Sequence, residues 1–421
     1  MRKLLEFKLA FLAKLFLWRF HPKIVAITGS VGKTSTKEAC LSVLQTKFRV
    51  RQSQGNYNNE LGMPLTIIGA ESAGRNLLVW TGILIKGFIK LFYQSDYPQV
   101  LVLELGVDHP GNMEYLTRIL GRIDVAVITD IGISHLEFFP DQSALAREKL
   151  NLIRRLPSDS SAILNFDSPK VYEGRNQTKA KVFGYGFGDE TEIRATDFHL
   201  IESEGCQGAN FKAHYKGNVM PFFLPNSLGQ PGVYAALAAL GVGLHFGINL
   251  VEASEALKSY KPPLGRQRFI AGVNNTSIID DTYNAAPAST IMAIDTLNNI
   301  AKARKVIAIG SMAELGAQSD AGHKAVAAKI VESAISLVFL VGEEAKTIRE
   351  ELLRRKFNGR VEWFPNSDLA KTRVKKNILT GDAILVKGSQ SARMEKIVKE
   401  IMAEPSRASE LLVRQSPKWL S

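Results

Sequence analysis

Short apolar runs that end in polar residues recur along the first part of the chain and predict strands of a parallel β-sheet. Such runs occupy residues 23–27, 100–104 and 125–130, and a helical pattern over residues 35–44 follows the first of them. Strands that are apolar at successive positions are typical of a parallel sheet covered by helices on both faces. We therefore expect an α/β domain whose chemistry lies at the carboxyl ends of these strands.

The pattern changes twice in the second part of the chain. Residues 180–223 show short alternating stretches with several glycines, which predict a small antiparallel region, and a helix is expected at 233–240. The proline pair Pro262-Pro263 then interrupts the chain, and a new alternation of strands and helices begins. Its strands are expected at residues 277–280, 305–309, 336–341 and 383–386.

These changes divide the chain into three predicted parts. An apolar, basic helix occupies residues 1–22, and a central α/β domain with a mostly parallel sheet and the small antiparallel region occupies 23–261. A Rossmann-like α/β domain occupies 262–421. The total length of 421 residues fits this number of parts.

The net charge of +12 favours anionic partners such as nucleotides, phosphorylated sugars or acidic lipid surfaces. Nucleic acid is not expected as a partner, because the basic residues are spread out and no recognition motif accompanies them. The two cysteines, Cys40 and Cys206, have no CxxC spacing, which argues against a disulfide framework or a zinc site. A reducing cytoplasm fits this cysteine usage best.

Two basic, apolar stretches, residues 1–20 and 76–93, stand apart from the strand pattern. The first lacks a cleavage site for a signal peptide and is too charged to cross a bilayer. Its charged residues are Arg2, Lys3, Glu6, Lys8, Lys14 and Arg19. The two stretches are expected either to form a patch that contacts the inner face of a membrane or to pack together as helices.

The segment Thr28-Gly-Ser-Val-Gly-Lys-Thr-Ser35 joins the first strand to the first helix and predicts a phosphate-binding loop. Backbone N–H groups of such a loop and of the helix that follows surround phosphate oxygens. The lysine adds a positive charge, and the threonine adds a hydroxyl for Mg²⁺. We expect a P-loop ATPase domain in which ATP is held by Gly29, Ser30, Val31, Gly32, Lys33, Thr34 and Ser35.

The form TGSxGKTS resembles the Mur ligase family, the ATP-dependent amide-forming enzymes of peptidoglycan precursor synthesis. Further segments extend the resemblance over most of the chain and favour the branch that adds D-alanyl-D-alanine. They are Gly55–Pro64 (GNYNNELGMP), Glu104–Gly111 (ELGVDHPG), Asp280–Pro287 (DDTYNAAP), Met312–Gly316 (MAELG) and Val386–Glu395 (VKGSQSARME).

The resemblance implies that two Mg²⁺ ions are held by Thr34, Glu104 and His135 together with Lys149, a lysine that is carbamylated in the family. Lys33, His135 and Lys149 are then the expected catalytic residues. Alone, Glu104 is equally consistent with a capping carboxylate at a strand end, and His135 with a structural histidine. Lys149 alone favours a solvated helix lysine.

The resemblance also assigns residues on both sides of the nucleotide. Arg266, Asp281 and Asn284 are expected to contact ATP from the carboxy-terminal domain, although an exposed arginine and an Asx turn are the alternatives. The expected substrate residues are Asn58, Asn59, Lys387, Ser389 and Arg393. Arginine suits the dipeptide carboxylate because it can bind it with two hydrogen bonds.

The implied reaction activates a muramyl-peptide carboxylate with the γ-phosphate of ATP and then joins it to an amino acid or dipeptide. The alternatives are another amide ligase of the superfamily, which forms polyglutamate or modifies a lipid-linked precursor, and a nucleotide-gated scaffold without activity. Only 27 residues precede Thr28, so the family's separate domain for the uridine diphosphate is not expected here. The acceptor thus stays open between a soluble, UDP-linked and a lipid-linked peptide. Pro231, Gly232 and Ala235 replace residues that usually help to place adenine.

Overall fold

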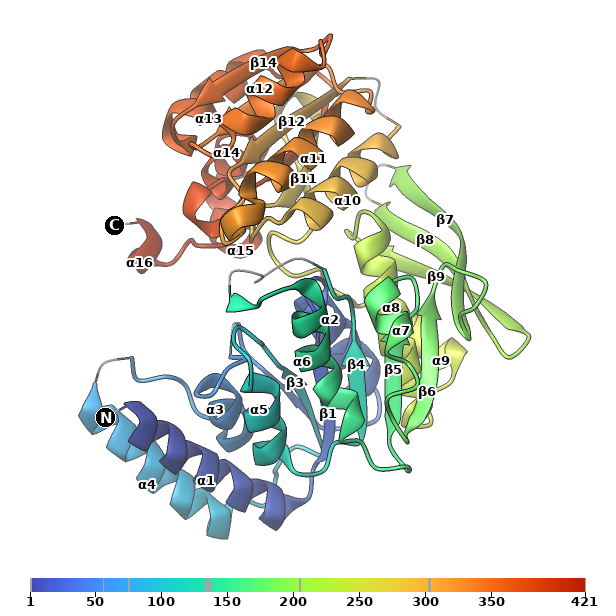
Figure 1. Ribbon diagram of the computed structural model, residues 1–421, viewed down its shortest axis with the longest axis vertical. Helices are drawn as coiled ribbons and strands as arrows, with labels where there is room; N and C mark the ends of the chain where they lie inside the picture. Colours follow the sequence, from blue (N-terminus) through green and yellow to red (C-terminus); the bar gives the residue numbers. More distant parts are fainter. Residues whose placement is uncertain are drawn as a thin grey trace.

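The computed structural model describes residues 2–55, 57–74, 76–132, 138–203, 206–301 and 304–420. Figure 1 shows two sheets with their helices, one above the other, and a pair of helices at the lower left that lies outside both. The first sheet carries the amino-terminal half of the chain, and the second carries the rest. The α/β fold class predicted from the sequence is confirmed.

The first sheet has nine strands in the order β2-β3-β1-β4-β5-β6-β7-β8-β9. Neighbours are parallel from β2 to β7, and the β7-β8-β9 part is antiparallel. The strands are β1 (Lys23–Thr28), β2 (Val50–Gln52), β3 (Val100–Glu104), β4 (Val125–Ile128), β5 (Ser161–Asn165), β6 (Lys181–Gly186), β7 (Ile193–Ser203), β8 (Cys206–Tyr215) and β9 (Asn218–Pro225). The antiparallel region is therefore smaller than predicted, since residues 181–186 extend the parallel part.

Helices cover both faces of the parallel part, which explains why its strands are apolar throughout. Ile24 and Ala26 of β1 belong to the core under one layer of helices, while Val25 and Ile27 belong to the core under the other. The helices that follow β1 to β9 along the chain are α2 (Lys33–Leu44), α3 (Gly62–Ile68), α5 (Asn112–Leu120), α6 (Gln142–Arg154), α7 (Pro169–Glu173), α8 (Gln230–His245) and α9 (Leu250–Leu257). α2 and α8 lie against each other on one face.

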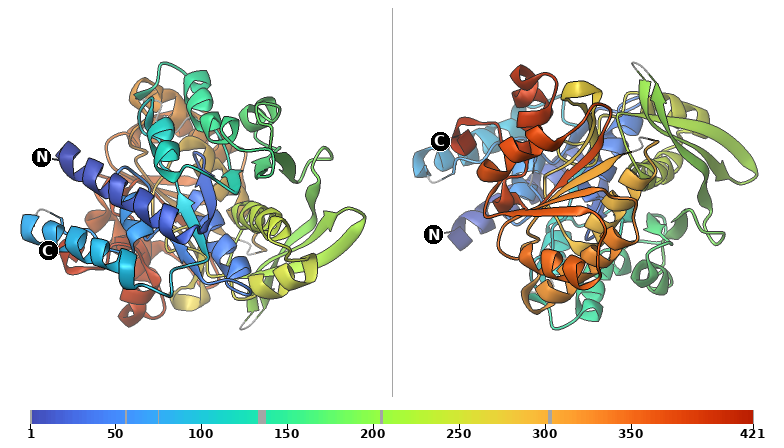
Figure 2. Two further views of the ribbon diagram at one scale, coloured as in Figure 1. Left: turned by 90° about the horizontal axis from the view of Figure 1, so that it is seen from below. Right: turned by 90° about the horizontal axis from the view of Figure 1, so that it is seen from above.

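The two basic, apolar stretches form α1 (Arg2–Phe20) and α4 (Leu77–Tyr93), which lie side by side in Figures 1 and 2. Leu9, Ala13 and Phe16 turn one face of α1 toward the core. Gly87 allows α4 to approach α1 closely, because a Cβ there would lie 2.7 Å from Leu12 Cδ2. The expected packing of the two helices on each other is thus observed. None of the described helices is both long and apolar enough to cross a membrane.

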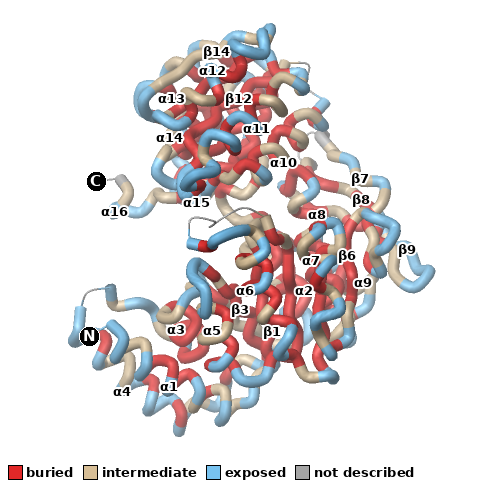
Figure 3. Tube along the Cα trace, viewed as in Figure 1, coloured by how far each residue is buried: buried red, intermediate tan, exposed pale blue. Residues whose placement is uncertain are grey.

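The second sheet has six strands in the order β10-β11-β15-β12-β13-β14, all parallel except β10. The strands are β10 (Arg268–Ala271), β11 (Ser277–Asp281), β12 (Lys305–Gly310), β13 (Leu337–Val341), β14 (Arg360–Phe364) and β15 (Ala383–Lys387). Its helices are α10 (Pro287–Asn298), α11 (Ser319–Val331), α12 (Lys346–Arg354), α13 (Ser367–Asn377), α14 (Glu395–Ile401), α15 (Ala408–Leu411) and α16 (Pro417–Leu420). Figure 3 shows the buried strands enclosed by these helices.

The chain passes from the first sheet to the second between α9 and β10, in the segment that contains Pro262 and Pro263. Beyond this segment the two halves are joined where residues 226–228 run beside residues 267–269. Leu228 N donates to Gln267 O at 3.3 Å, and Phe269 N donates to Asn226 O at 3.3 Å. The domain boundary at residue 262 stays a prediction.

Candidate active site

The loop between β1 and α2 is bent by two glycines and held from the end of β4. Gly29 has a φ of 151° and Gly32 a φ of 90°. A Cβ on Gly29 would lie 2.0 Å from Thr129 Oγ1. Thr129 Oγ1 donates to Val31 O at 2.6 Å, and Ser30 N donates to the carbonyl oxygen of Asp130 at 2.7 Å. The predicted phosphate-binding loop is therefore fixed in shape by its neighbour strand.

Two lysines meet at this loop. Lys33 Nζ donates to Gly29 O at 2.7 Å, and Lys149 Nζ, from α6, donates to the same oxygen at 3.3 Å. Burial lowers the pKa of Lys33, and burial together with the nearby Lys33 charge lowers the pKa of Lys149 to about 7. Lys149 is only 1% exposed, which excludes a solvated lysine. The pair concentrates positive charge where a phosphate would bind.

Glu104, at the end of β3, joins the loop to the segment around Asn58. Its Oε2 accepts a hydrogen bond from Thr34 Oγ1 at 3.1 Å, and its Oε1 accepts one from Asn58 Nδ2 at 3.2 Å. The carboxylate is buried. β1 and β3 are parallel neighbours in the sheet, so their carboxyl ends lie side by side. This brings Glu104, at the end of β3, next to Thr34, which follows β1.

The oxygens at this edge are of the kind that Mg²⁺ prefers, because the hydroxyl of Thr34 and the carboxylate of Glu104 are hard donors within reach of a phosphate. Among the described residues no group of three or more His, Cys, Asp or Glu side chains could hold a metal ion. A metal here would therefore need ligands of other kinds, such as Thr34 or the nucleotide. His135 lies outside the described residues.

Asn59 does not join Asn58 in the site. Its Oδ1 accepts hydrogen bonds from Leu61 N at 3.2 Å and from Gly62 N at 2.9 Å, at the beginning of α3. Asn58, by contrast, also holds the end of β3 in place, because Gly106 N donates to Asn58 O at 2.7 Å. The two neighbouring asparagines thus have different surroundings, and only Asn58 reaches the carboxylate of Glu104.

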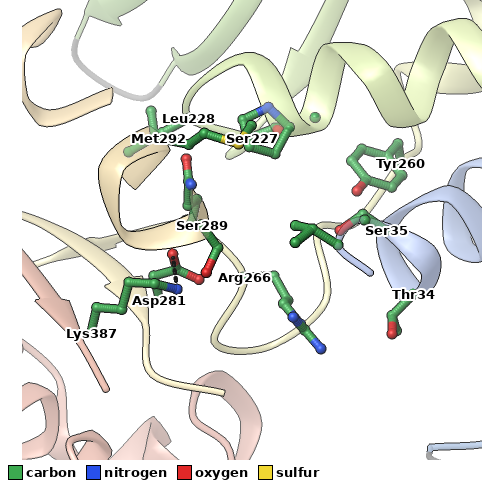
Figure 4. Close-up of a pocket in the computed structure, with 15 residues that line it drawn as sticks. Thr34, Ser35, Ser227, Leu228, Tyr260, Arg266, Asp281, Ser289, Met292 and Lys387 are labelled. Atoms are coloured by element: carbon green, nitrogen blue, oxygen red, sulfur yellow. Dashed lines mark hydrogen bonds and ion pairs between the residues drawn. The ribbon is translucent and has the colours of Figure 1, made fainter. Parts of the chain in front are cut away.

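A pocket between the two sheets is lined by Thr34 and Ser35 from α2 and by Arg266, Asp281 and Lys387 from the second half of the chain (Figure 4). In this view Arg266 lies between the Asp281–Lys387 pair and Thr34. Its guanidinium lies 4.1 Å from the centre of the Tyr283 ring. Arg266 is half-buried, so it is not an ordinary surface arginine.

Asp281 and Lys387 form a buried ion pair at the floor of this pocket. Lys387 Nζ donates to Asp281 Oδ2 at 2.7 Å and to Asn284 O at 3.0 Å. Burial lowers the pKa of Lys387, and the adjacent Asp281 acts in the opposite direction. Asn284 itself is exposed, and its Oδ1 accepts from Ala285 N at 2.9 Å, as in the predicted Asx turn.

Ser389 and Arg393, the two predicted substrate residues that follow β15, lie apart from Lys387. Ser389 is buried, and its Oγ accepts from Ala313 N at 2.7 Å. Arg393 Nε donates to Glu395 Oε1 at 2.6 Å, and its Nη2 donates to the carbonyl oxygen of Trp419 at 2.8 Å. Arg393 faces a surface pocket beside α16 rather than the pocket that holds Arg266. The structure therefore does not bring Lys387, Ser389 and Arg393 together.

Two sets of contacts were missed by the sequence analysis. Thr129 and Asp130, which follow β4, hold the glycine loop in place. The apolar run over 125–130 predicted that they lie at a strand end but did not indicate these contacts. Arg414, from the tail, donates to Tyr283 O at 3.1 Å, to Thr282 O, and to Glu395 Oε2 at 2.9 Å. Nothing in the sequence pattern signals this last set, because it joins residues far apart in the chain.

Comparisons with known proteins match most of the chain to one family. A family model for the Mur ligase middle domain matches residues 27–80 and 87–243, and one for the Mur ligase, glutamate ligase domain matches residues 265–390. The UDP-N-acetylmuramoyl-tripeptide--D-alanyl-D-alanine ligase of Bacillus subtilis (strain 168) is 32% identical over 396 residues, which are 94% of this chain and 79% of that protein. The enzyme of the same name from Escherichia coli (strain K12) is 29% identical and covers 90% of this chain and 76% of its own.

Solved structures lead to the same family. MurF ligase from Thermotoga maritima in complex with ADP has a TM-score of 0.78 and 25% identity, covering 94% of this chain and 83% of its own. MurF from Acinetobacter baumannii has a TM-score of 0.77 and 26% identity, covering 93% of this chain and 79% of its own. The chain belongs to the Mur ligase family.

Proposed function

We propose that the protein is an ATP-dependent, ADP-forming ligase that joins D-alanyl-D-alanine to the carboxylate of a muramyl tripeptide in peptidoglycan precursor synthesis. The observation that carries the proposal is the meeting of Lys33, Lys149, Thr34 and Glu104 around one glycine loop. The likeness to named D-alanyl-D-alanine ligases over 94% of the chain supports the choice of substrates.

The reaction has two steps that the site can accommodate. A carboxylate oxygen of the acceptor attacks the γ-phosphorus of ATP, the bond to the β–γ bridging oxygen breaks, and ADP leaves. The dipeptide amine then attacks the carbonyl carbon of the acyl phosphate, loses a proton, and expels inorganic phosphate. Lys33 and the N–H groups of the loop hold the phosphate charge during the first step. Arg266, which lines the same pocket as Thr34 and Ser35, is proposed to bind the phosphates from the second half of the chain.

Two Mg²⁺ ions, when bound, would neutralise charge on the phosphates and the acyl oxygen. Thr34 Oγ1 and Glu104 are the proposed ligands that the structure describes, and His135 is a proposed ligand that lies outside the described residues. Because Glu104 also binds the amide of Asn58, the side chain of Asn58 orients this ligand. Ser30, Val31, Ser35 and Asn284 complete the proposed nucleotide contacts.

Lys149 is proposed to carry a carbamate. Its neutral amine would attack CO₂ and lose one proton, which turns a buried cation into an anionic oxygen ligand. The position of its Nζ, at the oxygen that Lys33 also binds, would bring the modified group beside the phosphate site. NMR of the protein in ¹³C-bicarbonate should show a carbamate signal that Lys149→Ala abolishes. A spectrum without this signal would contradict the modification while leaving the ligase assignment intact.

The decisive experiment measures ADP release and product mass with UDP-linked muramyl tripeptide and D-alanyl-D-alanine. Turnover should require both substrates and should fall by at least about a hundredfold in Lys33→Ala, because the phosphate charge loses its buried partner. Lys356→Ala, which removes an exposed lysine elsewhere, is the matched control. If no acceptor and amine pair stimulates ADP release, the protein is a nucleotide-binding scaffold instead.

The same assay distinguishes this ligase from related enzymes with different substrates. Product with glutamate rather than the dipeptide would favour a polyglutamate-forming relative, and product only with a lipid-linked peptide would identify a membrane-bound acceptor. GTP should be compared with ATP, since Pro231 and Ala235 line the space beside the loop and offer no side-chain hydrogen bonds to a base. We further infer that the enzyme works in the cytoplasm at the inner face of the membrane, with residues 1–20 and 76–93 in peripheral contact.

A further inference from the structure

Both α1 and α4 carry a row of exposed apolar side chains on the side that faces away from the sheet. On α1 the residues Leu4, Phe7, Phe11 and Trp18 follow helical spacing and are 57 to 71% exposed. On α4 the corresponding residues are Leu77, Leu78, Val79, Ile85, Phe88, Ile89, Phe92 and Tyr93, which are 47 to 84% exposed. The two helices lie side by side (Figure 2), and we call the surface that carries these residues the α1–α4 face. An apolar surface of this extent marks an interaction site.

The charges around the α1–α4 face are almost all positive. Its exposed basic residues are Lys3, Lys8, Lys14, Arg19, Lys86 and Lys90. α4 contains no acidic residue, and the single acidic residue of α1, Glu6, accepts a hydrogen bond from Arg2 Nε at 2.8 Å. At the carboxyl end of α1, Lys14 and Trp18 also line a pocket with Arg118, Arg122 and Asp124, where Arg118 is paired with Glu114 and Arg122 with Asp159. The basic character of the surface therefore comes from the two helices.

We propose that the α1–α4 face docks the enzyme on an anionic lipid surface. Exposed phenylalanines and a tryptophan insert at the boundary of headgroups and acyl chains, while the surrounding lysines and arginines bind the headgroup phosphates. A second copy of the chain fits this surface poorly, since pairing two such faces would bring like charges together in a water-poor interface. Neither helix crosses the bilayer.

Docking of this kind has a structural link to the reaction. The segment that leads into α4 is hydrogen-bonded to the segment with Asn58, because Ser72 N donates to Tyr57 OH at 2.8 Å. Tyr57 precedes Asn58, whose amide binds Glu104. These contacts connect the α1–α4 face to the proposed metal ligand. The docking itself does not depend on the proposed ligase activity.

The test is co-sedimentation of the full chain with phosphatidylcholine vesicles that contain or lack phosphatidylglycerol. Binding should require the anionic lipid and weaken as salt is raised. Phe7→Asp with Phe88→Asp should weaken binding by about tenfold or more, since each substitution removes a large apolar group and adds a negative charge. Leu353→Asp with Leu369→Asp is the matched control, because these leucines are 64% and 58% exposed on α12 and α13.

Circular dichroism should show all variants folded, since Phe7 and Phe88 are 68% and 54% exposed. Lys8→Glu with Lys86→Glu gives a second measurement that leaves the apolar residues in place, and it should also weaken binding. The inference is overturned if the chain ignores anionic vesicles, if the phenylalanine variant binds like its control, or if the chain forms a dimer through this face. ADP release by the phenylalanine variant with soluble substrates should be unchanged, which separates docking from catalysis.

Discussion

Removing one member of the buried Asp281–Lys387 pair should destabilise the protein far more than removing both charges. Lys387 is 2% exposed and Asp281 is 4% exposed, and their charged atoms lie 2.7 Å apart. In Lys387→Met the carboxyl of Asp281 is left buried and must either stay charged or take up a proton. Breaking a buried ion pair by removing one partner generally costs about 3 to 5 kcal/mol.

The double variant Asp281→Asn with Lys387→Met keeps no charge at this position, so it should recover most of the loss.

Urea denaturation followed by circular dichroism at pH 7 measures these differences for the wild type, both single variants and the double variant. A double variant that is as unstable as Lys387→Met would refute the reasoning, because the loss would then come from packing rather than from the unpaired charge.

Two further predictions concern the glycine loop between β1 and α2 and the carboxyl of Asp280, the residue before Asp281. Gly29→Ala should weaken ATP binding in calorimetry by about tenfold more than Gly32→Ala, since a Cβ meets Thr129 Oγ1 at 2.0 Å in the first case and nothing closer than 3.7 Å in the second. Equal losses would show that backbone strain alone matters. Burial raises the pKa of Asp280 to about 6, so its stabilising contribution is complete below about pH 4 and is lost as the pH rises through 6. The unfolding free energy of the wild type relative to Asp280→Asn should therefore fall by about 3 kcal/mol between pH 4 and pH 7, and a constant difference would contradict the shift.

Most central strands of both sheets were predictable because burial on both faces makes them apolar. β5 was not predicted, although it is buried, since the polar residues Ser161 and Asn165 leave it an apolar run of only three residues. β14 was not predicted, since it is an edge strand that is only partly buried and carries Arg360 and Glu362. The glycine loop was equally predictable, because its glycines and its lysine follow one another in the chain. The burial of Lys149 was not, since a lysine within a helix has no local feature that distinguishes an inward side chain from a solvated one.

The orientation of single side chains was the least predictable aspect of the site. Asn58 and Asn59 are neighbours of the same type, yet one binds Glu104 and the other binds the beginning of α3. Likewise, Lys387 ends β15 and Arg393 follows it, but the two side chains face different pockets. These differences arise from tertiary contacts between distant segments, which periodicity and spacing do not encode.

The hydrogen bonds between residues 226–228 and 267–269 give the two halves of the protein a pivot. A rotation of the second sheet that keeps these bonds has its axis beside Arg266, which directly precedes them in the chain. A group near an axis moves little. Because Arg268 lies opposite Asp280 in the pairing of β10 with β11, Asp281 and its partner Lys387 lie close to this axis as well. Such a rotation would therefore keep Arg266 and the ion pair nearly in place and would move β13 and β14, at the other side of the sheet, the most.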